Sequence, residues 1–284
     1  MNCEDFTLMN FNMIPDVMRG ALTWGDTLRA AKAAGLSFVD IFDCSPEALA
    51  EYRTASEETG VRIDCYICFV SLVGDPDAAE RELRRVYAAA NSMEAERVMI
   101  VPYRMSGEDF ALVREHDGDW VRTRLEQGFR LAAAIAAEYG LPICYETTPQ
   151  DVFRLSGTED LRWMLERVPE AGLVFDTANM LPHGDETLPA LEALRPHIVH
   201  VHLKDVALAE TSEPLPYAER TADGRVMRVT VSGTGVIPVR EVYERLKAGG
   251  YAGKFAIEYC RPEQTPATVE EHAARIKAHL AAFA

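Results

Sequence analysis

One short stretch of the sequence places side chains able to do acid–base or metal chemistry at every second position. Residues 198–205 read Ile-Val-His-Val-His-Leu-Lys-Asp, so His200, His202 and Lys204 alternate with apolar residues. A period of two puts alternate side chains on opposite faces of a β-strand. Apolar, element-forming sequence lies on both sides of this stretch. We therefore expect its polar face to line an enclosed polar centre.

Three other short apolar runs end on a carboxylate. Residues 141–146 end on Glu146, residues 173–176 on Asp176 and residues 254–258 on Glu258. If these strands are parallel neighbours of the histidine strand, the three carboxylates meet His202 at one end of the sheet. Three carboxylates and an imidazole suit a divalent cation, with Mn²⁺ as the preferred ion and Mg²⁺, Co²⁺ or Zn²⁺ as alternatives. We predict one divalent metal ion bound by these four residues.

The elements that must position these side chains follow an alternating pattern along the chain. Strands are predicted at 6–11, 38–42, 62–70 and 98–101, and then at the four runs that end in the candidate ligands. Helices lie between them, one of them opening on the capping sequence Ser45-Pro46-Glu47. Eight strand-helix units without a composition shift predict the α/β class and one (β/α)₈ TIM barrel domain covering residues 1–284. Active sites of such barrels lie at the carboxyl ends of the strands, where the candidate ligands stand.

Two connections are longer than simple turns. Residues 102–119 are a candidate lid or pocket wall. Residues 206–233 contain Pro214, Pro216 and the turn signal Asp223-Gly224, which predict an irregular excursion or small hairpin over the mouth of the barrel. Gly233-Thr234-Gly235 is predicted to be a turn before a helix at Pro238, because a lone Gly-Thr-Gly is weak support for a phosphate loop.

Composition argues against several classes of protein. The 48% hydrophobic and 26% charged residues are typical of a folded globular chain, and the formal net charge of −16 disfavours nucleic acid as a partner. No apolar run approaches the length of a membrane-spanning helix, and the first residues carry acids where a secretory signal would be basic. The six scattered cysteines are typical of buried thiols in a reducing compartment, and Cys65 and Cys68 should face opposite sides of one strand. We predict a cytoplasmic protein without a membrane partner.

The second half of the chain resembles the xylose-isomerase-like TIM barrel superfamily, which includes sugar phosphate isomerases, ketose 3-epimerases, inosose isomerases and dehydratases, and endonuclease IV. The matching segments are Tyr145-Glu146, Phe175-Asp176-Thr177, the His200 to Asp205 run, Gly233-Thr234-Gly235 with Ile237-Pro238, and Ile257-Glu258. The resemblance implies that Glu146, Asp176, His202 and Glu258 are the ligands of a single metal. It also implies that Glu146 and Glu258 are the catalytic acid/base pair of the epimerase branch.

Five further residues are candidates for binding substrate. Asn179 stands where many members of the superfamily have His, and its amide can hydrogen-bond a hydroxyl. Lys204 could reach a substrate carboxylate, alkoxide or phosphate, or could instead pair with Asp205 or another acid. Arg104 and Arg261 follow strands and are candidates of the same kind. His200 is interpreted either as a substrate contact or as a core histidine that supports the site.

The leading functional prediction is a metal-dependent isomerase or epimerase acting on a small sugar, sugar phosphate, inosose or other polyol, with proton transfer beside a carbonyl held by the metal. An inosose-type dehydratase, which is a lyase, could use the same site. Two less favoured alternatives are a DNA-repair enzyme of the endonuclease IV type and a non-catalytic sugar-binding protein. The predicted partner is a small-molecule sugar or polyol, and homo-oligomer formation is left open.

Overall fold

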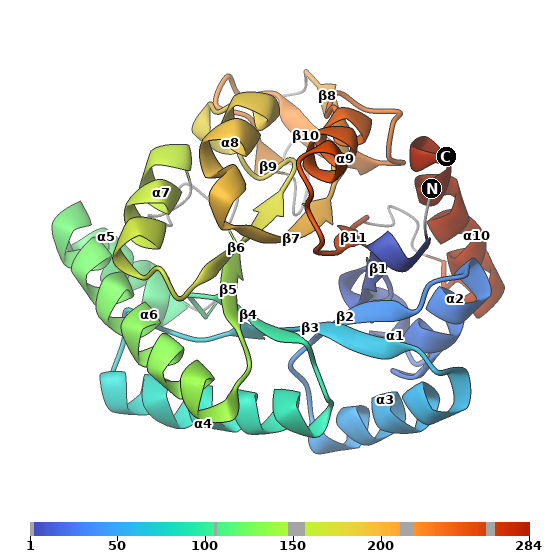
Figure 1. Cartoon of the computed structure of the whole chain (residues 1–284), viewed down its shortest axis with the longest axis horizontal. Coiled ribbons are helices and arrows are strands. Elements are labelled where there is room, and N and C mark those ends of the chain that lie inside the picture. The colour runs from blue at the N-terminus through green and yellow to red at the C-terminus, as the bar shows by residue number, and fades with distance from the viewer. Residues whose placement is uncertain (1–2, 105–106, 147–156, 211–218, 260–264) are drawn as a thin grey trace.

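A ring of parallel strands surrounded by helices forms the body of the protein (Figure 1). The computed structural model describes residues 3–104, 107–146, 157–210, 219–259 and 265–284. Within these ranges the closed barrel runs in the order β1-β2-β3-β4-β5-β6-β7-β11, and β11 pairs with β1 to close it. These strands are β1 (Phe6–Met9), β2 (Phe38–Phe42), β3 (Arg62–Phe69), β4 (Arg97–Val101), β5 (Ile143–Glu146), β6 (Gly172–Asp176), β7 (Ile198–Leu203) and β11 (Phe255–Ile257). The predicted α/β barrel is confirmed.

Helices cover the outside of the barrel, and α10 packs against α2 to close their ring. They are α1 (Ile14–Met18), α2 (Asp26–Ala34), α3 (Pro46–Thr59), α4 (Pro76–Ser92), α5 (Gly107–Glu115), α6 (Gly118–Tyr139), α7 (Thr158–Arg167), α8 (Thr187–Leu194), α9 (Val239–Ala248) and α10 (Val269–Leu280). Their ends follow local rules: the Ser45 hydroxyl accepts from the Ala48 N–H at the start of α3, and Gly60 ends that helix at φ +72°. None of the helices in the described ranges is both long and apolar enough to cross a membrane.

Two predicted segments differ in detail from the structure. β1 ends at Met9 rather than at Phe11, because Asn10 begins a short 3₁₀ turn and its side chain bonds the Tyr52 hydroxyl and the Phe42 N–H. The polar connection 102–119 is largely helical, since α5 occupies Gly107–Glu115.

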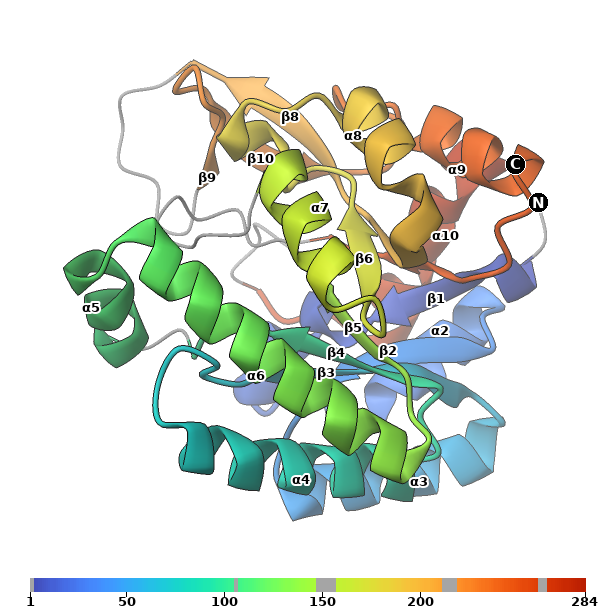
Figure 2. The same ribbon diagram turned by 60° about the vertical axis from the view of Figure 1, so that its left-hand side comes forward.

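The chain between β7 and α9 forms a separate antiparallel sheet. β8 (Asp205–Ala209) pairs with β10 (Val226–Thr230), which also pairs with β9 (Glu219–Arg220). Figures 1 and 2 show this sheet beside α8, beyond the ring of barrel strands. The β8–β10 pair agrees with the predicted hairpin, while residues 211–218 of the predicted excursion lie outside the described residues.

The core has two layers, separated by the barrel wall. The larger cluster lies between strands and helices, and a smaller one of Met9, Cys65, Ile67, Met99, Val101, Cys144 and Val174 fills part of the barrel interior. Cys68 belongs to the outer cluster, so Cys65 and Cys68 face opposite sides of β3 as predicted. Buried polar residues also line the interior, among them Asp40, His200 and His202, and the candidate site is built from residues of this kind.

Candidate metal centre

All four predicted ligands meet at the carboxyl ends of adjacent barrel strands. Ligand atoms of Glu146, Asp176, His202 and Glu258 all lie within 4.8 Å of one another, and all four residues are buried. They come from β5, β6 and β7 and from the residue after β11, which are neighbours in the barrel. Parallel strands place their carboxyl ends at one edge, so side chains distant in sequence converge there.

The backbone fixes the direction of each ligand. Asp176 is paired in register with His202, and its Oδ1 accepts the N–H groups of Ala178 (2.7 Å) and Asn179 (2.8 Å). Its second oxygen, Oδ2, is thereby left facing the site. The Thr177 hydroxyl donates to the Lys204 carbonyl (2.8 Å) and accepts its N–H (2.9 Å), which ties the end of β6 to the end of β7.

His202 contacts carboxylates through its Nδ1 atom. Nδ1 lies 2.7 Å from Glu146 Oε1 and 3.4 Å from Glu258 Oε2. The two glutamates approach from β5 on one side and from β11 on the other. The imidazole therefore presents Nδ1 to the point at which both carboxylates converge.

The donor set fits a divalent cation. Asp176 Oδ2 is buried and makes no hydrogen bond with any described residue, although it lies 3.0 Å from Lys204 Nζ. Burying a carboxylate oxygen that accepts no hydrogen bond costs free energy. Lys204 already offsets its charge from 3.0 Å, and a metal ion could take the place of that ammonium at Oδ2. Three carboxylates and an imidazole are ligands that Mg²⁺, Mn²⁺ and Zn²⁺ all accept.

Lys204 supplies a positive charge inside this cluster. Its Nζ lies 2.9 Å from Glu258 Oε1 and donates to Asn179 Oδ1 at 2.9 Å, in addition to its contact with Asp176. The neighbouring Asp205, a predicted alternative partner of Lys204, is engaged elsewhere. Its carboxylate accepts the N–H groups of Gly233, Gly235 and Ile237.

The electrostatics follow from burial and from the mixture of charges. Burial raises the pKa of Asp176 to about 7, with Glu258 and Glu146 adding to the effect and Lys204 opposing it. Burial would also raise the pKa of Glu258, but Lys204 and His202 lower that pKa to about 2. Burial opposes a charge on His202, yet Glu146 and Glu258 raise its pKa well above the usual value. Without a metal, the proton on His202 and the Lys204 ammonium balance the carboxylates.

The other predicted residues lie at different distances from this centre. Asn179 is buried beside Lys204, whereas the Arg104 side chain is 53% exposed and lies 3.7 Å from Glu82. His200 lies one step deeper on β7, fully buried, with Nε2 2.7 Å from Asp40 Oδ2. Arg261 lies outside the described residues.

Three acids in or near the site were missed by the sequence reasoning. Asp40 and Asp64 lie inside apolar strands, β2 and β3, and both are buried. A carboxylate in the middle of an apolar strand was the signal that could have identified them. Glu219, on β9, interacts electrostatically with Lys204, Glu258 and Glu146, and burial raises its pKa. No local pattern marked Glu219, because the small sheet brings it to the site.

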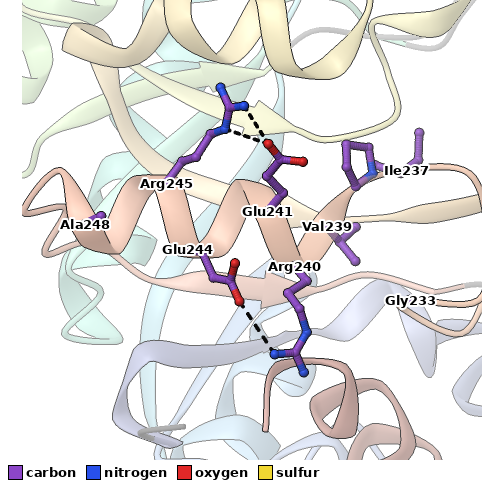
Figure 3. Close-up of a pocket in the computed structure, with 9 residues that line it drawn as sticks. Gly233, Ile237, Val239, Arg240, Glu241, Glu244, Arg245 and Ala248 are labelled. Carbon is purple, nitrogen blue, oxygen red and sulfur yellow. Dashed lines mark hydrogen bonds and ion pairs between the residues drawn. The ribbon is translucent and has the colours of Figure 1, made fainter.

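A groove of about 690 Å³ lies along α9, on the outside of the barrel. Figure 3 shows its charged side chains paired with one another, Arg240 with Glu244 and Arg245 with Glu241. The groove contains none of the candidate ligands. It is therefore separate from the candidate metal centre.

Comparisons with known proteins agree with the barrel fold. Residues 28–279 match the family described as "Xylose isomerase-like TIM barrel". The chain is 30% identical over 165 residues to an inosose dehydratase of Geobacillus thermodenitrificans, a match covering 54% of this chain and 51% of the relative. It is 32% identical over 170 residues to an inosose dehydratase of Yersinia enterocolitica, covering 57% and 54%. The aligned part thus spans about half the length of these curated relatives.

Solved structures show the same fold at low sequence identity. D-psicose 3-epimerase from Clostridium cellulolyticum H10, solved with D-tagatose, superposes with a TM-score of 0.72 at 14% identity, covering 98% of both chains. A xylose isomerase-like TIM barrel protein from Mycobacterium smegmatis, solved in complex with magnesium, gives 0.67 at 17% identity, covering 99% and 98%. Because the family match spans most of the sequence and the closed parallel barrel agrees with it, the chain belongs to the xylose isomerase-like TIM barrel family.

Proposed function

We propose that this protein is a divalent-metal-dependent isomerase or epimerase that moves a proton beside the carbonyl of a small sugar, inosose or related polyol. The observation that carries the proposal is the approach of Glu146 and Glu258 to His202 Nδ1 from two sides, at 2.7 and 3.4 Å. A substrate held between two carboxylates can lose a proton to one and regain a proton from the other. The epimerase among the structural neighbours supports this type of reaction by analogy of fold.

Each of the four clustered residues has a proposed role in the reaction. Glu146, Asp176, His202 and Glu258 would hold the metal, which would polarise the substrate carbonyl and make the adjacent C–H more acidic. Mn²⁺ is the preferred ion, with Mg²⁺, Co²⁺ and Zn²⁺ as alternatives. One glutamate carboxylate takes the proton from carbon, and the electron pair of the C–H bond moves toward the carbonyl oxygen. Return of a proton to carbon restores the carbonyl and completes the isomerisation.

Lys204 has the charge and position to assist this step. Its ammonium lies at the convergence of Asp176 and Glu258, and its side chain is 9% exposed. A cation in a buried site stabilises developing negative charge on oxygen far more than it would in water. Asn179, which accepts from Lys204, can exchange this bond for one to a substrate hydroxyl.

A dehydratase is the second candidate, favoured by the curated relatives named inosose dehydratase. In this reaction one carboxylate takes the C–H proton, a carbon–carbon double bond forms, and the hydroxyl on the next carbon leaves as water after taking a proton. That last proton needs a donor beside the substrate. Glu219 is the candidate donor, because burial raises its pKa and its charge interacts with those of Lys204, Glu258 and Glu146.

Isosteric Glu146→Gln and Glu258→Gln variants test the proposal. A panel of keto-sugars and inososes is incubated with the metal-loaded protein in D₂O, and deuterium uptake and products are measured together with metal content. Each variant should lose about 10²- to 10⁴-fold in rate, as expected for removal of a general base. In an epimerase, one variant still exchanges a substrate proton without inverting the centre, while a dehydratase releases water and an unsaturated product.

The control is Glu138→Gln on the barrel exterior, since Glu138 pairs with Arg84 and is half exposed. This change should leave both exchange and metal content unaffected. If both site variants keep their metal and near-native exchange, the two glutamates are not the base. A wild-type protein that holds no divalent ion would refute the proposed metal dependence.

A further inference from the structure

A column of charged and polar side chains runs through the barrel interior beneath the candidate metal centre. His200 Nε2 lies 2.7 Å from Asp40 Oδ2, and His200 Nδ1 lies 3.3 Å from Asp64 Oδ2. Asp64 is joined in turn to Arg97, whose Nε lies 3.1 Å away and whose Nη1 donates to the Val199 carbonyl. The column therefore extends from His202 down to a partly exposed arginine.

Such a column is unusual at this place in a barrel, where layers of branched apolar side chains normally fill the interior. Asp40 and His200 are fully buried and Asp64 is 1% exposed. Burying charged groups costs free energy unless each is paired and hydrogen-bonded. The ion pairs within the column explain why the fold tolerates these buried charges. The function of the column follows from its contact with the metal centre.

The link between the column and the metal centre is Asp40. Its Oδ1 accepts from the Thr7 hydroxyl at 3.0 Å, which fixes the carboxylate on β2. Its Oδ2 lies between two imidazoles, 2.7 Å from His200 Nε2 and 3.9 Å from His202 Nε2. The Nε2 atom of His202 is buried and has no hydrogen-bond partner among the described residues.

Metal binding at Nδ1 of His202 would require a hydrogen-bond acceptor at its Nε2. Nδ1 of His202 faces the two glutamates, so it is the nitrogen placed to bind a metal. An imidazole that binds a metal through Nδ1 carries its hydrogen on Nε2, and such a hydrogen is ordinarily donated to a carboxylate or carbonyl. A buried N–H without an acceptor costs free energy, and the carboxylate that faces Nε2 is Asp40.

We propose that Asp40 is a positioning residue for the metal ligand His202, and that His200 and Thr7 hold Asp40 in place. In the metal-loaded protein Asp40 Oδ2 accepts from His202 Nε2 as well as from His200. This bond selects the tautomer with a free Nδ1, fixes the plane of the ring and makes Nδ1 a stronger donor to the metal. The inference rests on the proposed metal centre and adds a residue that the set of four ligands does not include.

The test compares two isosteric variants, Asp40→Asn and Asp64→Asn, which remove one charge each from equally buried positions of the same column. Zn²⁺ is titrated into metal-free wild type and both variants. Asp40→Asn should weaken Zn²⁺ binding about 10- to 100-fold, as is typical when the carboxylate partner of a ligating histidine is lost. Asp64→Asn, one histidine further from the ligand, should lower thermal stability while changing Zn²⁺ affinity much less.

A second readout uses the wild-type protein and so does not depend on whether a variant folds. With ¹⁵N-labelled histidine and bound Zn²⁺, the His202 ring should show a protonated Nε2 whose hydrogen is shifted downfield and protected from exchange. The seven histidines make assignment by single substitutions practical.

Each outcome has a distinct meaning. The proposed role of Asp40 is wrong if both variants lose Zn²⁺ affinity equally, or if Asp40→Asn binds Zn²⁺ as tightly as wild type. It is also wrong if the Nε2 hydrogen of His202 exchanges rapidly. None of these three results would affect the proposed function. Two Zn²⁺ ions per chain would also overturn the role of Asp40, because Asp40, His200 and His202 form a second group able to hold a metal, in which Asp40 would itself be a ligand. Failure of the wild type to bind any ion would instead refute the proposed function.

Discussion

At the scale of single residues, Lys204 is the side chain that links the metal-free structure to the proposed reaction. Its ammonium contacts Asp176 Oδ2 and Glu258 Oε1, and both oxygens belong to candidate ligands. Burial opposes the charge, but Asp176 and Glu258 raise the pKa of Lys204 well above its usual value. In the proposed mechanism the lysine would compete with the metal for these oxygens and would remain available to stabilise a substrate anion.

Replacing Lys204 with methionine keeps the length of the side chain and removes its charge. We expect Lys204→Met to bind the divalent metal at least as tightly as wild type, because a competing cation is gone, while turnover falls about 10²- to 10³-fold, as for loss of one donor to a developing anion. Metal titration and steady-state kinetics on the same preparations measure the two effects. The matched control is Lys247→Met, which removes an outer-surface lysine paired with Asp5. Weaker metal binding together with normal turnover would contradict this role for Lys204.

At the scale of secondary-structure elements, the small sheet after β7 is anchored to the barrel independently of the metal ligands. The Asp205 carboxylate at the start of β8 accepts three N–H groups from residues 233–237, which joins β8 to the turn before α9. A side chain at position 235 would come within 2.3 Å of Asp205 Oδ1, so glycine is required there. These N–H groups are already engaged, as expected for a turn rather than a phosphate-binding loop.

The function of this sheet can be tested by shortening it. Ala209 and Val226 are paired in register, so residues 210–225 can be replaced by Asn-Gly to make a two-residue hairpin. Because the four ligands come from other elements, metal affinity should be unchanged, whereas kcat/KM should fall by about 10²-fold or more through lost positioning of substrate. The point variant Glu219→Gln, measured alongside, shows how much of the loss is due to that carboxyl. Unchanged kinetics in the shortened protein would remove the sheet from the mechanism.

At the scale of the whole molecule, the proposed metal centre would couple the stability of the protein to both metal and pH. The raised pKa values of Asp176 and His202 mean that near neutral pH the metal-free folded state still binds protons that the unfolded chain has already released, at its ordinary pKa values of 3.8 for Asp and 6.5 for His. The stability that these two groups contribute to the metal-free protein is therefore greatest at low pH. This contribution is lost as pH rises, for Asp176 as the pH passes its folded-state pKa of about 7. A metal must displace the same protons, so its affinity changes in the opposite direction with pH.

We therefore expect the increase in Tm produced by a fixed excess of divalent metal to grow from pH 5.5 to pH 8. A ligand at 100 times its Kd stabilises a folded protein by about 2.7 kcal/mol, and this contribution shrinks as protons compete for the ligands. Thermal unfolding with and without metal at several pH values measures the difference. Asp176→Asn is the control, since an amide does not titrate, and its metal-free Tm should depend less on pH than that of wild type. A metal-induced increase in Tm that stays constant over this range would contradict the linkage.

The sequence by itself determined the barrel and the four candidate ligands, for a physical reason that is local. A run of alternating or apolar residues with a carboxylate or histidine at or near its end specifies both a strand and the face on which that polar side chain lies. Glu146 and Asp176 end β5 and β6, and His202 is one residue before the end of β7. Parallel strands then bring these ends together whatever the sequence between them. The helix ends at Ser45 and Gly60 were equally local, because a cap needs only its own turn.

Only the tertiary structure decided which charges pair in the interior. Asp40 meets His200 across 160 residues, and no local pattern relates them. The partners of Lys204 were likewise decided by tertiary structure. Three backbone N–H groups from the turn before α9 occupy the Asp205 carboxylate, and Lys204 pairs with Asp176 and Glu258 instead. Side-chain pairing inside a barrel depends on strand register and on the depth of each residue along the axis. The register shift between Val39 and Asp40 is one such feature, and it emerges only when the strands have assembled.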